Sequence, residues 1–194
     1  PTEELGGVIW TYMGPTNKKP PPPKFEWTQA PDSHRHATKV IQECNWLQAL
    51  EGGVDTSHDA ILHRDFSTVT VEDDLTPSIV PDLARLVRGG APSLELEVTG
   101  YGYRYFGIRS LGDEGTDVQA YHYVMPFTQI RADRYAEKSI GGHYWVPMND
   151  ENCMVWNWEY NYSDEPLSDV RRAEYGLGNG PTHVDQTTFL SFRN

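Results

Sequence analysis

Apolar and polar residues alternate with a period of two through much of the chain after residue 93. Leucine and valine alternate with glutamate and threonine in residues 94–99, and tyrosine recurs at every second position in 101–105. Similar runs cover 117–125, 142–148 and 153–162, with Gly- and Asp-containing turns between them. A period of two is typical of half-buried β-strands. The pattern predicts four to six antiparallel strands in a curved sheet.

The first 34 residues show a different pattern. Residues 8–13 are an apolar run between glycines, which predicts one strand. Six prolines follow in residues 15–31, four of them consecutive, and they predict a stiff linker of polyproline II type. Phe25 and Trp27 are expected to hold this linker against a surface.

Helical spacing lies between the linker and the sheet pattern. Residues 44–50 predict a helix, which the Gly52–Gly53 pair should interrupt, because two glycines cost roughly 1–2 kcal/mol there relative to two alanines. The pair indicates a kink or a close backbone approach. A second helical turn is expected over 55–63 and a short helix over 82–87, whereas the acidic, Gly-rich residues 164–188 predict an extended loop. A curved antiparallel sheet with helices on one side is an α+β fold.

Composition narrows the class of protein. Of 194 residues 38% are hydrophobic, enough for a core, and the net charge of −12 argues against nucleic acid and anionic membrane surfaces as partners. The two cysteines, Cys44 and Cys153, form no C-x-x-C motif, so neither a zinc ribbon nor a Cys-ligated iron–sulfur cluster fits within this sequence. The low number of cysteines fits a reducing cytoplasm. No signal peptide or run of 18 apolar residues is found, so a cytoplasmic protein is expected. The sequence starts at Pro1, which suggests a segment of a longer protein.

The chemistry of the sequence is concentrated in residues 45–63. His58 and His63 are neutral imidazoles at pH 7 that can bind a divalent metal, and Asp55 stands three residues before His58. A carboxylate in that position can accept the second ring N–H of a metal-bound histidine. Five residues turn an ideal helix by about 140°, so the two histidines can share one ion only if the helix ends, bends or bulges between them. The alternative is a polar surface with one hydrogen-bonded core histidine.

Three stretches in order resemble one family. Residues 45–63 resemble the mononuclear-iron motif of the large (alpha) subunit of Rieske non-haem iron ring-hydroxylating oxygenases. In that motif an Asp is followed three residues later by a His, and a second His comes five residues after the first. Residues 6–15 look like the last strand of the preceding Rieske domain, and residues 143–152 resemble a late catalytic-domain strand and turn of the phthalate dioxygenase-type branch. The resemblance spans nearly the whole chain.

The resemblance implies a helix-grip fold (START-like or Bet v1-like), in which a curved sheet surrounds a helix and a substrate cavity. It implies Fe(II) bound by His58, His63 and one carboxylate, with Asp55 as the electron bridge to the cluster of a neighbouring subunit. Electrons would pass from an NAD(P)H-dependent reductase or ferredoxin through a Rieske [2Fe–2S] cluster. The reaction would use O₂ to hydroxylate or O-demethylate an aromatic substrate, which can be carboxylated, in a homotrimer or homohexamer.

The resemblance also divides the chain. Residues 1–14 would be the end of a mostly absent Rieske domain, 15–34 the linker, and 35–194 a catalytic domain that is incomplete at its C-terminus. The [2Fe–2S] ligands would lie upstream or in a neighbouring subunit, and the third iron ligand after Asn194. The rival hypothesis is a START-like domain that binds a small ligand without redox chemistry.

Substrate contacts are expected from strand residues that line the cavity. Arg104 and Arg109 are the first candidates, because a carboxylated aromatic needs a bidentate arginine. Ion pairs with the abundant acidic residues are the alternative for both. His143 is the third candidate, against a histidine that is merely hydrogen-bonded in the sheet.

Overall fold

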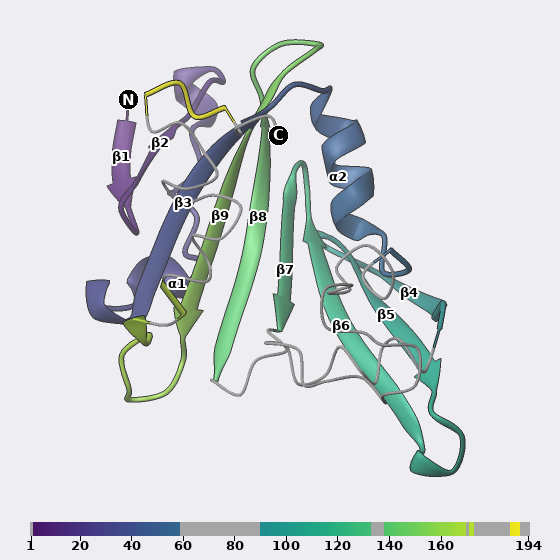
Figure 1. Cartoon of the computed structure of the whole chain (residues 1–194). Coiled ribbons are helices and arrows are strands. Elements are labelled where there is room, and N and C mark those ends of the chain that lie inside the picture. Colours follow the sequence, from purple (N-terminus) through teal and green to yellow (C-terminus); the bar gives the residue numbers. More distant parts are fainter. Residues whose placement is uncertain (1, 59–89, 133–137, 170, 173–186, 191–194) are drawn as a thin grey trace.

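The computed structural model describes residues 2–58, 90–132, 138–169, 171–172 and 187–190. Its main feature is a seven-stranded antiparallel sheet in the order β3-β9-β8-β7-β6-β5-β4 (Figure 1). The strands are β3 (Arg35–Gln42), β4 (Ser93–Thr99), β5 (Gly102–Ser110), β6 (Thr116–Val124), β7 (Thr128–Ala132), β8 (Ser139–Pro147) and β9 (Cys153–Asn161).

One helix packs on the sheet face that we call the inner face. Helix α2 (Trp46–Val54) begins at Asn45, whose side chain accepts the N–H of Leu47, a typical N-cap. Its apolar stripe contains Leu50 together with Trp46, Ala49 and Val54. These positions recur every three or four residues and pack against Tyr123 and Trp145 of the sheet, with Val155 beside them. The α+β helix-grip fold that the resemblance implies is confirmed.

The opposite, outer face is covered at the β3 end by the N-terminal segment (Figure 1). Strands β1 (Thr2–Leu5) and β2 (Val8–Thr11) form a hairpin, followed by the short helices η1 (Thr16–Lys18), α1 (Glu26–Gln29) and η2 (Asp32–His34). Trp27 is 1% exposed, stacks on Trp158 and donates to the hydroxyl of Tyr144 at 2.9 Å. The prediction that Phe25 and Trp27 anchor the linker is confirmed.

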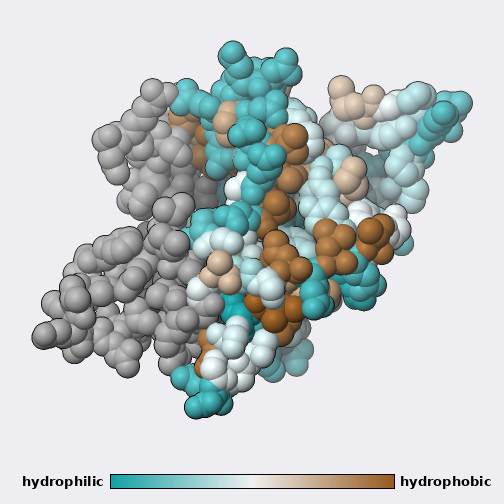
Figure 2. Space-filling model, turned by 90° about the vertical axis from the view of Figure 1, so that its right-hand side faces the viewer, coloured by the Kyte–Doolittle hydropathy of each residue, from teal (hydrophilic) through white to brown (hydrophobic). Residues whose placement is uncertain are grey.

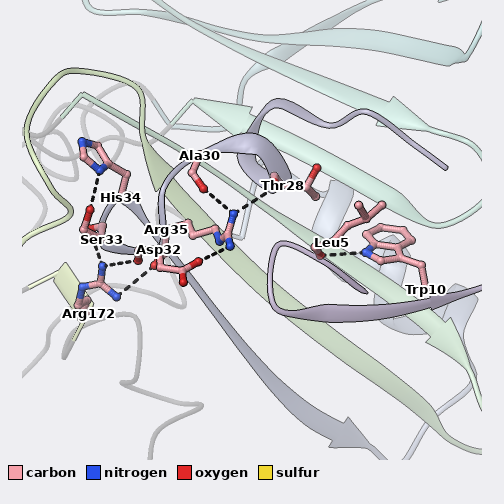
Figure 3. Close-up of polar contacts among 9 residues, drawn as sticks. All are labelled: Leu5, Trp10, Thr28, Ala30, Asp32, Ser33, His34, Arg35 and Arg172. Atoms are coloured by element: carbon pink, nitrogen blue, oxygen red, sulfur yellow. Dashed lines mark hydrogen bonds and ion pairs between the residues drawn. The ribbon is translucent and has the colours of Figure 1, made fainter. Parts of the chain in front are cut away.

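Arg35 fixes the junction of this linker with β3. Its guanidinium donates to the carbonyls of Thr28 and Ala30, and it forms an ion pair with Asp32 (Figure 3). Arg172 donates to the carbonyls of Asp32 and Ser33 from the other side of the same turn. Two arginines therefore hold this turn, which lies far from α2 (Figure 1).

The structure differs from the sequence expectations at four places. The strand expected in residues 8–13 is found as β2, but its hairpin partner β1 was not predicted; Gly6 and Gly7, with φ of 67° and 78°, make the tight turn between them. Helix α2 continues through Gly52–Gly53 to Val54 instead of stopping there. Asp55 begins no helical turn; it is the C-cap of α2 with extended φ and ψ. Strand β7 was missed, since five residues are too short to show a clear period.

The predicted short helix over 82–87 lies outside the described residues, as do His63 and most of 164–188. At the free edge of the sheet, β4 exposes Leu94, Leu96 and Val98 on the inner side at 61%, 61% and 80%. Figure 2, which faces the edge with β4 and α2, shows apolar residues gathered in a band there. Within the described ranges, no helix is long and apolar enough to cross a membrane.

Candidate active site

Asp55 and His58 lie at the C-terminal end of α2, directly after the helix stops. The Asp55 carboxylate accepts the backbone N–H of Ser57 at 2.8 Å and that of His58 at 3.2 Å. The same carboxylate lies 3.2 Å from Nδ1 of the His58 ring. An Asx turn therefore places the imidazole against the carboxylate, in place of the helical turn that the sequence predicted from Asp55 onward.

The electrostatics of this turn favour a charged Asp55. Partial burial raises the pKa of Asp55. The hydrogen bonds from the N–H groups of Ser57 and His58, together with the His58 ring, lower the pKa by more, so it lies below the ordinary value. A carboxylate that stays ionised can only accept a hydrogen bond, so it favours the ring form of His58 in which Nδ1 carries the proton and donates. Nε2 then has the lone pair that a metal needs.

Gly53 and Trp145 determine how closely α2 approaches the sheet. A Cβ at Gly53 would lie 2.1 Å from the indole of Trp145, whereas a Cβ at Gly52 meets no atom within 4 Å. The close backbone approach that the sequence predicted is thus confirmed for Gly53. It brings the end of α2, and with it Asp55, down onto the inner face.

Two buried side chains of the sheet bind the backbone on both sides of Asp55. Gln129 on β7 donates to the carbonyl of Gly53 at 2.6 Å, and Arg109 on β5 donates to the carbonyl of Thr56 at 2.5 Å. Each of these two side chains is 1% exposed. The sequence showed Arg109 only as a possible substrate contact and gave no sign of Gln129.

The inner face carries a row of polar groups across four strands. The register pairs Thr38 with Asn157, Asn157 with His143, and His143 with Gln129. Nδ1 of His143 lies 2.6 Å from Oδ1 of Asn157. Burial, and secondarily the charge of Arg131, lowers the pKa of His143 to about 3. His143 is thus a neutral polar group on the face that α2 covers.

The structure separates the two arginines that the sequence grouped together. Arg104 lies on the outer face, 43% exposed, and forms an ion pair with Glu97 at 2.7 Å, which is the alternative that the sequence left open. Arg109 lies on the inner face, but its guanidinium is occupied by Thr56, Gly90 and Gln119. Arg131, which the sequence did not indicate, lies on the inner face opposite Tyr121 and Gly141.

Metal ligands are only partly described. His58 is placed, whereas His63 lies outside the described residues and any third ligand after Asn194 lies outside the sequence. Among the side chains that the structure places, no three from His, Cys, Asp and Glu group together as a metal site. The geometry of Asp55 and His58 fits one histidine ligand and its supporting carboxylate.

Comparison with known proteins identifies the family. Residues 11–177 match the LigXa C-terminal domain-like family. This chain belongs to that family. The resemblance to the catalytic domain of a Rieske oxygenase large subunit, which the sequence motifs indicated, is confirmed by this family match and by the relatives described next.

Two curated relatives are oxygenase subunits. The family member is 28% identical over 172 residues to the 3-chlorobenzoate-3,4-dioxygenase oxygenase subunit of Comamonas testosteroni, covering 86% of this chain and 38% of the relative. It is 37% identical over 111 residues to the phthalate 4,5-dioxygenase oxygenase subunit of Pseudomonas putida, covering 56% of this chain and 24% of the relative. The chain thus spans well under half the length of these relatives.

A solved structure shows the same fold. The oxygenase in an oxygenase–ferredoxin complex of carbazole 1,9a-dioxygenase aligns with 92% of this chain and 50% of its own, with a TM-score of 0.54 and 16% identity. At this identity the match establishes the fold alone.

Proposed function

We propose that this chain is the catalytic part of a Rieske-type oxygenase that binds mononuclear Fe(II) through His58 and His63. The observation that supports the proposal most is the contact between Asp55 and His58, because a carboxylate on Nδ1 is the usual support of a histidine metal ligand. The third ligand would be a carboxylate after Asn194. The bound iron would supply the open coordination positions at which O₂ is activated.

Asp55 has two roles in this proposal. It holds the His58 ring in one orientation and keeps the proton on Nδ1, through a carboxylate that its hydrogen bonds keep ionised. It is also the proposed electron bridge from the [2Fe–2S] cluster of a neighbouring subunit. Its side chain is 46% exposed, which leaves it open to such a contact. A homotrimer or homohexamer would supply that neighbour.

The substrate is proposed to be an aromatic compound, held on the inner face, that carries a carboxylate. The two curated relatives have chlorobenzoate and phthalate in their names, and both are carboxylated aromatics. On the inner face, His143 offers a neutral ring that can form hydrogen bonds. Arg131 offers a cation, which interacts electrostatically with His143 and Tyr105. Hydroxylation and O-demethylation are both compatible with this arrangement. The electron donor would be a ferredoxin or an NAD(P)H-dependent reductase.

Metal analysis of the full-length subunit tests this function. The His58→Ala/His63→Ala variant should lose the mononuclear iron and turnover while it keeps the [2Fe–2S] absorption. The matched control is His122→Ala, because His122 lies on the outer face against the hydroxyl of Tyr101. That control should keep both iron and turnover.

Retention of mononuclear iron and turnover in the double variant would refute the proposal. A wild-type subunit that binds an aromatic ligand but no mononuclear iron would instead be the START-like ligand-binding domain.

A further inference from the structure

The end of α2 is attached to the sheet at two points that bracket Asp55. Gly53 precedes Asp55 by two residues and Thr56 follows it directly. Nε2 of Gln129 donates a hydrogen bond to the carbonyl of Gly53, and the guanidinium of Arg109 donates one to the carbonyl of Thr56. The two donors come from β7 and β5, so two separate strands determine the path of this short segment.

Both donors are themselves fixed. Nε2 of Gln129 also donates to the hydroxyl of Tyr105 at 2.6 Å, and Tyr105 stacks on Tyr121 with 4.7 Å between ring centroids. Arg109 also donates to the Gly90 carbonyl and to Oε1 of Gln119, each at 3.1 Å. Asp117 on the next strand lies 4.0 Å from its guanidinium. These contacts leave little rotational freedom to either donor.

The choice of these side chains follows from the helix end. The last carbonyls of a helix have no partner within it, and they carry partial negative charge. Gln129, which is itself buried, satisfies one such carbonyl, that of the half-buried Gly53. Oε1 of Gln129 has no hydrogen-bond partner among the described residues, and a buried unpaired acceptor is unfavourable. The orientation of the amide is therefore determined by the two hydrogen bonds that its nitrogen donates.

We infer that Gln129 and Arg109 are positioning residues, which orient the His58 imidazole through the backbone that holds Asp55. This inference deepens the proposed function and rests on it. The route runs from the two sheet donors to the carbonyls of Gly53 and Thr56, then to the Asp55 carboxylate, and finally to Nδ1 of His58. Arg109 thereby receives a role other than substrate recognition.

The alternative is that both residues only stabilise the fold. Arg35 offers a matched control, because it too is an arginine that donates to backbone carbonyls, those of Thr28 and Ala30, but at the linker. A purely structural role predicts that Arg35→Lys and Arg109→Lys have equivalent effects at the metal site. A positioning role predicts a difference.

The test compares Arg109→Lys, Gln129→Met and Arg35→Lys in the full-length subunit. The first readout is the dissociation constant for Fe(II), measured anaerobically by competition with a chelating dye. The second is hydrogen exchange at the amides of Ser57 and His58 in protein without mononuclear iron. Gln129→Glu, which keeps the size and replaces the donor nitrogen by oxygen, serves if Gln129→Met does not fold.

The inference predicts that the Arg109 and Gln129 variants bind Fe(II) about 10- to 100-fold more weakly, the range typical for partners that support metal ligands. It also predicts faster exchange at Ser57 and His58, whereas Arg35→Lys changes neither readout. Unchanged affinity in both variants, or an equal loss in Arg35→Lys, would overturn it. A wild-type subunit without Fe(II) affinity would refute the proposed function, and the exchange rates would still decide whether the two residues hold the segment.

Discussion

The carboxylate of Asp55 lies 3.2 Å from Nδ1 of His58, and it accepts the backbone N–H groups of Ser57 and His58 as well. One side chain therefore ends helix α2, builds the turn that follows, and orients the imidazole three residues later. The same residue is the proposed electron bridge. If both proposed roles hold, a change at Asp55 is expected to affect electron transfer without removing a metal ligand.

Asp55→Asn is expected to keep mononuclear iron but to lose coupled oxygenation. The amide oxygen can still accept one backbone N–H, so the turn should persist, whereas the negative charge that stabilises the proton on Nδ1 is gone. The measurement is product formed per O₂ consumed in the reconstituted system, with iron content determined in parallel. Full coupled activity in this variant would remove the bridging role.

The two adjacent glycines of α2 give a matched pair for stability. Gly53→Ala should lower the free energy of unfolding by about 1–3 kcal/mol, because its Cβ would overlap the buried indole of Trp145. Gly52→Ala should raise it by roughly 0.5–1 kcal/mol, because the site is open and alanine favours helix. Urea unfolding of both variants measures the difference. Equal effects would show that the helix does not lie this close to β8.

His143 should make stability depend on pH. Burial and Arg131 depress its pKa in the folded protein to about 3, whereas the unfolded chain has an ordinary value near 6.5. The unfolded state thus binds more protons below pH 6.5, and stability falls as the pH drops. Wild type should lose about 1 kcal/mol per pH unit more than His143→Gln between pH 6 and 5. Parallel profiles from chemical unfolding would contradict the depressed pKa.

Arg131 and Arg104 lie on opposite faces of the sheet, so they separate substrate recognition from general charge effects. Arg131→Met should raise the KM or Kd for a carboxylated aromatic at least about tenfold, since charge-assisted hydrogen bonds contribute roughly 1.5–3 kcal/mol. Arg104→Met should leave that constant unchanged, because its partner is the exposed Glu97. Isothermal titration with a benzoate against an uncharged benzene derivative measures the effect. Equal losses for both ligands would exclude an ionic role of Arg131.

Much of the sheet could be predicted from the sequence, and the reason is physical. In strands β5 and β6 mainly the inner side is buried, so their residues alternate clearly. Strands β8 and β9 are packed on both sides, by α2 and by the N-terminal segment, and their continuous aromatic-rich runs also predict strands. Strand β7 has five residues, too few for a visible period, although it supplies Gln129 and Arg131. The hairpin depended on positive φ at Gly6 and Gly7, which the sequence allows but does not require.

The site was predictable only as far as local spacing reaches. Asp55 and His58 are three residues apart, and their contact follows from that short separation. The contacts of Gln129 with Gly53 and of Arg109 with Thr56 join residues 76 and 53 positions apart. Such pairings depend on strand register and on which face each side chain occupies, as the opposite placement of Arg104 and Arg109 shows.

The most direct test of the metal assignment is a crystal structure of the full-length subunit with anomalous diffraction at the iron absorption edge. We expect a mononuclear iron peak bonded to Nε2 of His58 and to His63, with Asp55 on Nδ1 of His58 and not bonded to the metal. An iron bound elsewhere, or coordinated directly by Asp55, would contradict the assignment.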